Sequence, residues 1–118
     1  MNSQELENRL IKFAVLIIEI AEGLVKTKAG NHISGQMIRS GTSPALNYGE
    51  AQDAESRKDF IHKIKVVLKE LRETLVALKI IKMANMYDNM SKLDYAISES
   101  NELVSIFVKS VKTAKQNV

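Results

Sequence analysis

Residues 56–84 read SRKDFIHKIKVVLKELRETLVALKIIKMA and contain neither glycine nor proline. Large apolar residues recur here every three or four positions, the spacing that places side chains on one face of an α-helix. They are Ile61, Ile64, Leu68, Leu71, Leu75 and Leu78. Ser56 precedes the pattern and Asp59 lies three residues later, an arrangement typical of a helix N-cap. The stretch therefore predicts a helix from Arg57 to Ala84.

The first helix of the chain is expected from about Ser3 to Lys28, with Ser3 as its N-cap and Gly30 as its stop. Its apolar residues extend well beyond one face. Those outside the main stripe are Ile11, Val15, Ile18 and Val25. One bundle core requires an apolar stripe only roughly 100° wide. The broader surface of this segment predicts a second buried face, and hence self-association.

The second helix is expected from about residue 31 to residue 53, and Pro44 lies inside it. Proline lacks a backbone N–H group and its ring crowds the preceding turn. We therefore expect a kink near Ser40 or Gly41. The small residues of this segment also allow a neighbouring helix to approach closely.

The fourth helix is expected from about Lys92 to Lys115, with Ser91 as its N-cap. Residues 85–90 connect it to the preceding helix, and so short a connection favours antiparallel packing of the two. Together the four segments predict an all-α protein. Its expected fold is an antiparallel up-down-up-down four-helix bundle that forms a single domain over residues 1–118.

The composition excludes several classes of protein. The chain has 118 residues, of which 45% are hydrophobic and 26% are charged, and it has no cysteine. The missing cysteines exclude disulfides, thiolate zinc sites and cysteine nucleophiles. The longest apolar run, residues 13–18, is too short to cross a bilayer, and no secretory signal is visible. We therefore expect a cytoplasmic protein without a membrane partner.

The second half of the chain is the basic half. Residues 1–59 hold seven Lys/Arg and eight Asp/Glu, whereas residues 60–118 hold ten and six. Five cations of the helix over residues 57–84 share one side of it, together with His62. They are Lys58, Lys65, Lys69, Arg72 and Lys79. Cations spaced about 5–6 Å apart suit a polyphosphate backbone, so these five are the candidate nucleic-acid contacts. The alternative is an ordinary solvated helix face.

Two weaker patterns centre on His62. Arg57 and His62 have the Arg-x-x-x-x-His spacing of the ribonuclease motif of HEPN domains, in which a histidine moves a proton and an arginine stabilises phosphate charge. Asp59 and His62 resemble half of a di-iron site, but such a site needs a second acid–histidine pair. The only other histidine, His32, has no acid three residues before it. We expect no metal and no cofactor.

Polar residues near the predicted kink favour a structural role. Arg39, Asn47 and Glu50 lie on the second segment, where such groups bond to backbone released by proline or pair with charges on the next helix. Glu70 and Glu73 of the third segment are the candidate partners of Arg39. The five residues predict a structural polar network.

The same two segments resemble a known family. The residues that carry the resemblance are Gln36–Arg39, Ser43, Asn47, Glu50–Ala51, Ser56–Lys63 and Leu68–Thr74. They are similar to those of the four helix bundle protein family, also called the 23S rRNA intervening-sequence protein family. This family includes relatives of the accessory variability determinant of diversity-generating retroelements.

The resemblance implies a non-enzymatic protein that assembles as a homopentamer. The retroelement accessory protein binds a reverse transcriptase and nucleic acid, whereas members encoded in rRNA intervening sequences have no established role. RNA, DNA or a reverse transcriptase is therefore the expected partner beside the protein itself. Five copies of a chain of net charge +3 would carry about +15, which steers polyanions better than one copy does. The alternatives are a purely structural protein-interaction oligomer and a ribonuclease that uses Arg57 and His62.

Overall fold

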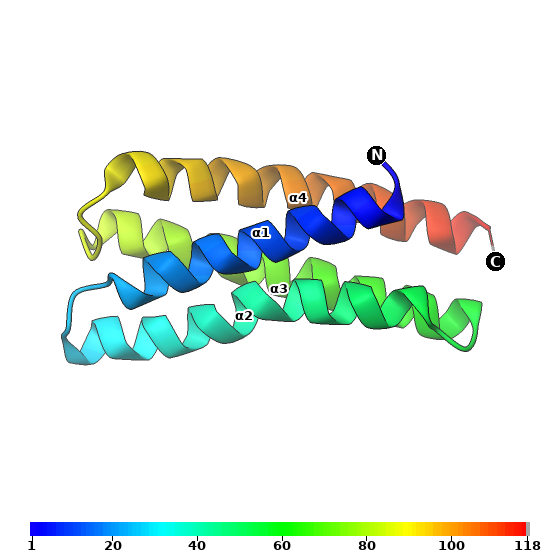
Figure 1. Ribbon diagram of the computed structural model, residues 1–118, viewed down its shortest axis with the longest axis horizontal. Helices are drawn as coiled ribbons and strands as arrows, with labels where there is room; N and C mark the ends of the chain where they lie inside the picture. The colour runs from blue at the N-terminus through cyan, green and yellow to red at the C-terminus, as the bar shows by residue number, and fades with distance from the viewer. Residues whose placement is uncertain (118) are drawn as a thin grey trace.

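The computed structural model describes residues 1–117, and within them the chain forms four α-helices and no strand. The helices are α1 (Ser3–Glu22), α2 (Lys28–Gln52), α3 (Arg57–Met83) and α4 (Met90–Gln116). Their long axes are roughly aligned, and the bundle measures 46 × 22 × 20 Å (Figure 1). Each helix packs against the next, and α4 closes the bundle against α1 along its loosest seam. The all-α four-helix bundle expected from the sequence is confirmed.

The first two helices meet at a different place from the one predicted. Asn2, not Ser3, caps α1, because its side-chain oxygen accepts a hydrogen bond of 2.8 Å from the Glu5 backbone N–H. The helix ends at Glu22 rather than Lys28, and α2 begins at Lys28 rather than Asn31. Gly30 is therefore not the stop of α1. It lies in the first turn of α2, where a Cβ atom would stand 1.9 Å from the Val25 carbonyl oxygen.

The predicted N-cap of α3 is confirmed, and that of α4 is wrong. Ser56 accepts a hydrogen bond of 3.0 Å from the Asp59 N–H. At α4 the cap is Asn89, two residues before the predicted Ser91, and it accepts from the Lys92 N–H at 3.1 Å. Each cap accepts a hydrogen bond from one backbone N–H group that would otherwise have no partner within its helix.

The core draws on all four helices, and its largest fully buried side chains include Phe13, Met37, Leu71 and Phe107. On α3 the buried face is rotated from the predicted stripe, because Ile61, Leu68 and Leu75 are only partly buried. The residues that α3 buries are Ile64, Val67, Glu70, Leu71, Thr74, Leu78 and Ile81. The rotation places a carboxylate and a hydroxyl inside the bundle.

Helices α1 and α2 approach closely at Gly41. A Cβ atom on this residue would stand 2.5 Å from Cγ2 of Ile17, so only glycine fits. Helix α2 continues through Pro44. Near it, the Thr42 hydroxyl donates to the Ile38 carbonyl oxygen at 2.8 Å.

Within residues 1–117, no helix has the length and hydropathy that a membrane-spanning segment requires.

Candidate nucleic-acid interface

The five predicted phosphate contacts form a row along the outer side of α3. Lys58, Lys65, Lys69, Arg72 and Lys79 are all exposed, and all lie away from the buried face of the helix. Among the residues that the structure describes, none of the five takes part in an ion pair. We call these five residues the α3 row. Their charges are available to a partner outside the chain.

Two other cations of α3 behave differently. Lys63 pairs with Glu50 of α2 at 2.8 Å, and Lys82 pairs with Asp94 of α4 at 2.8 Å. The hydrogen bond and charge of Glu50 raise the pKa of Lys63 above its ordinary value. These two lysines are thus neutralised by carboxylates of neighbouring helices, whereas the α3 row is not.

Arg39 lies between Glu70 and Glu73 of α3. Its guanidinium donates to Glu70 at 2.8 Å and also pairs with Glu73. The hydrogen bond to Glu73, followed by the charge of Glu70, raises the pKa of Arg39. Glu70 is only 7% exposed, so Arg39 supplies the positive charge that a buried carboxylate requires. The structure brings these three predicted residues together.

The other two residues of the predicted network lie apart from this cluster. The Asn47 amide donates to the Ser43 carbonyl oxygen at 3.0 Å and to the Ser43 hydroxyl at 2.8 Å, both within α2. Glu50 pairs with Lys63. Asn47 therefore stabilises its own helix, and Glu50 joins α2 to α3.

Arg57 and His62 are both exposed but project in different directions. Five residues of an α-helix at about 100° each turn the second side chain roughly 140° away from the first. Arg57 lines two hollows at the end of the bundle, and His62 lines neither. This geometry does not support joint action on one phosphate.

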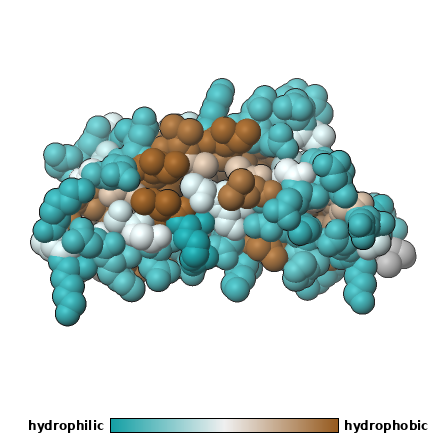
Figure 2. Space-filling model, turned by 60° about the horizontal axis from the view of Figure 1, so that its bottom comes forward, coloured by the Kyte–Doolittle hydropathy of each residue, from teal (hydrophilic) through white to brown (hydrophobic). Residues whose placement is uncertain are grey.

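Helices α1 and α2 share an apolar surface. Ile11, Val15 and Ile18 of α1 are 47%, 50% and 38% exposed, and Leu46 of α2 is 66% exposed. Figure 2 shows hydrophobic residues gathered over the middle of the face along which α1 and α2 run. Because isolated bundles expose few contiguous apolar residues, this surface is typical of a contact with another molecule.

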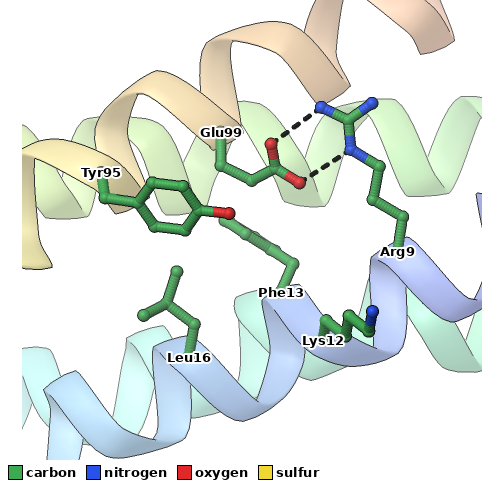
Figure 3. A pocket seen from close by; sticks show the side chains of 6 residues that line it. All are labelled: Arg9, Lys12, Phe13, Leu16, Tyr95 and Glu99. Carbon is green, nitrogen blue, oxygen red and sulfur yellow. Dashed lines mark hydrogen bonds and ion pairs between the residues drawn. The ribbon is translucent and has the colours of Figure 1, made fainter.

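A hollow that was not predicted lies between α1 and α4. It has a volume of about 430 Å³, and Tyr95 reaches from α4 toward Phe13 of α1 at its wall (Figure 3). Arg9 pairs there with Glu99 and also with Glu102, which raises the pKa of Arg9. Two carboxylates neutralise this arginine, whereas Lys12, which also lines the hollow, makes no ion pair within residues 1–117. No cluster of potential metal ligands occurs among residues 1–117.

A family model described as 23S rRNA-intervening sequence protein matches residues 3–109. The chain belongs to this family. The resemblance carried by the second and third helices is thereby confirmed.

A solved structure shows the same fold in a related protein. It is a protein with unknown function from the S23 ribosomal protein family of Bacteroides thetaiotaomicron, with 30% sequence identity and a TM-score of 0.82. The match covers 95% of this chain and 99% of that one. No protein with a curated description matches.

Proposed function

We propose that this protein is a non-enzymatic oligomeric scaffold that binds the phosphate backbone of RNA or DNA through the α3 row. The observation that carries the proposal is the state of these five cations, which are exposed and make no ion pair within residues 1–117. Other lysines of the same helix are paired. From Lys58 to Lys79 the row extends about 32 Å at 1.5 Å per residue, long enough for several phosphates. It contacts phosphate and does not read bases.

The proposed scaffold is a homopentamer built from single-domain bundles. The apolar surface over Ile11, Val15, Ile18 and Leu46 supports self-association, because contact between copies would remove it from water. Five copies place five α3 rows on one particle. A nucleic-acid enzyme such as a reverse transcriptase is the expected protein partner, and the cytoplasm is the expected location.

Within each bundle, the helices are proposed to alternate in direction, up-down-up-down. The register of the contacts supports this order. Along α1, Arg9 pairs with Glu99 and the later Glu19 pairs with the earlier Lys92 of α4. Between α2 and α3, Arg39 pairs with Glu70 and Glu73, whereas the later Glu50 pairs with the earlier Lys63. Numbers that rise on one helix while they fall on its neighbour indicate antiparallel neighbours.

The test is a salt titration of binding to mixed-sequence RNA and DNA. The test variant carries Lys65→Glu, Lys69→Glu and Arg72→Glu, and the matched control carries Lys12→Glu, Lys26→Glu and Lys28→Glu. Both change the net charge equally. At about 50 mM salt we expect the affinity of the test variant to fall at least tenfold and that of the control to fall threefold or less. The affinity of the test variant should also depend less steeply on salt concentration.

Equal losses in the two variants, or no binding by the unaltered protein at low salt, would contradict the proposal. A protein that stays oligomeric and binds no nucleic acid would instead be a structural interaction module. The apolar surface of α1 and α2 is the observation that favours this second candidate.

A further inference from the structure

One end of the bundle lacks the cover of its first helix. Helix α1 has 20 residues, whereas α3 and α4 have 27 each. At about 1.5 Å per residue, α1 is roughly 10 Å shorter. Figure 1 shows the last turns of α4 continuing beyond the start of α1. The first turn of α3 and the last turns of α4 therefore face open space that a longer α1 would fill.

This space forms a hollow of about 340 Å³ between α3 and α4. We call it the end groove, and its lining includes Arg57, Phe60, Lys109, Ser110, Thr113 and Asn117. A second hollow of about 290 Å³ adjoins it, because Arg57 and Phe60 line both. The end groove falls within the range of about 300–1,000 Å³ typical of small-ligand sites.

The lining has a definite chemistry. Arg57 and Lys109 are its only charged residues, and neither makes an ion pair within residues 1–117. Phe60 supplies an aromatic surface. Three side chains supply hydrogen-bonding groups, and the Ser110 hydroxyl donates to the Ile106 carbonyl oxygen at 3.0 Å, which leaves its own oxygen free to accept. An aromatic surface, hydrogen-bonding groups and two cations together match a ligand with a flat polar ring and an anionic group.

We propose that the end groove binds a nucleoside 5′-monophosphate group. Its base packs against Phe60, its phosphate contacts Arg57 and Lys109, and hydroxyl and amide groups contact the sugar and the base edge. The group has two sources, a free nucleotide or the 5′-phosphorylated end of a strand. Arg57 directly precedes Lys58, the first residue of the α3 row. A strand held here by its 5′ end would pass around the first turn of α3 to reach the row. Only the strand-end source rests on the proposed function.

Calorimetry with the full chain tests the site directly. The probes are adenosine 5′-monophosphate and adenosine, at low salt. We expect the nucleotide to bind at least tenfold more tightly than the nucleoside. Arg57→Gln with Lys109→Gln should abolish this difference. The matched control, Lys112→Gln with Lys115→Gln, removes two charges from the same end of α4 outside the lining and should keep affinity within threefold. Phe60→Leu keeps an apolar side chain and should weaken both probes severalfold.

A hexanucleotide with and without a 5′-phosphate distinguishes the two sources. Tighter binding of the phosphorylated form, lost in the Arg57→Gln, Lys109→Gln variant, identifies a strand end, and nucleotide binding without that preference identifies a free nucleotide. Both results support the site. No nucleotide binding up to about 10 mM, or binding that the double variant leaves intact, overturns it, as does preference for an acidic dipeptide over the nucleotide. If the protein binds long RNA but no nucleotide, this inference alone is overturned. If it binds the nucleotide but no long RNA, only the proposed function is overturned.

Discussion

Arg9 of α1 and Glu99 of α4 lie 90 positions apart in the chain and meet in a two-point ion pair. Nε and Nη2 of the arginine each lie 2.8 Å from a carboxylate oxygen. The pair joins the two helices along the loosest seam of the bundle, at the edge of the large hollow. Both side chains are mostly shielded, with 22% and 14% of their surfaces exposed. In this two-point geometry, arginine–carboxylate pairs contribute most to stability.

Breaking this pair should destabilise the fold. Arg9→Gln and Glu99→Gln are each expected to lower the free energy of unfolding by about 1–2 kcal/mol, because the first leaves the shielded Glu99 without its partner and the second leaves Arg9 with the exposed Glu102 alone. Urea unfolding of both single variants and the double variant measures their coupling. We expect a coupling of about 1 kcal/mol. Additive effects would show that the pair contributes nothing.

Two glycines of α2 should respond oppositely to alanine. Gly41→Ala is expected to lower the free energy of unfolding by about 1–3 kcal/mol, since its Cβ would overlap Ile17 of α1. At Gly35 an added Cβ meets no atom within 4 Å, so Gly35→Ala should stabilise the helix by about 0.5–1 kcal/mol. Thermal melts of both variants measure the contrast. Destabilisation by Gly35→Ala, or none by Gly41→Ala, would contradict the helix contact described here.

Tyr48 should make stability fall at high pH. Its ring packs edge-on against Phe107, with ring centroids 5.5 Å apart, and burial raises its pKa above the ordinary value of 10.0. The folded state thus disfavours the phenolate. The stability that the protonated Tyr48 contributes to the folded state is complete below pH 10. It is lost as the pH rises through the pKa of Tyr48 in the folded state.

Urea unfolding between pH 9 and pH 11.5 tests this dependence. Tyr48→Phe should lose less stability over the interval than the unaltered protein does. Tyr95→Phe is the control, because that side chain is 61% exposed. Identical pH profiles for all three proteins would count against a buried Tyr48.

The apolar surface of α1 should be required for self-association. Ile11→Ser, Val15→Ser and Ile18→Ser, made together, are expected to shift the protein to single subunits in sedimentation experiments. The three side chains point away from the core, so the variant should still unfold cooperatively. If the variant keeps the mass of the unaltered protein, the assembly must use another surface.

The four helices were predictable because their apolar periodicity is strong, whereas their ends depend on neighbours. Nothing in the local pattern distinguishes Asn2 from Ser3, or Asn89 from Ser91, as the cap. Gly30 is a plausible helix stop in sequence, yet Thr27 starts α2 before it and its side chain accepts from the Gly30 N–H at 3.0 Å. Helix ends were therefore the least accurate part of the prediction.

The buried face of α3 shows the same limit. Thr74 is fully buried, and its hydroxyl lies 2.8 Å from that of Ser40 on α2. A hydroxyl or carboxylate enters a core when a tertiary partner satisfies it, and periodicity cannot show that partner. The exposed α3 row follows from helical spacing alone. The end groove does not, because it depends on the short α1 and on the register that places Lys109 and Arg57 in the lining of one hollow.

The mass of the purified protein in solution tests this account most directly. The account requires several copies to cover the apolar surface of α1 and α2 and to combine their α3 rows. One chain has a mass of 13.2 kDa, so light scattering or sedimentation equilibrium should give about 66 kDa for five copies. A single, well-behaved species of 13.2 kDa at a concentration of about 100 μM would contradict the account.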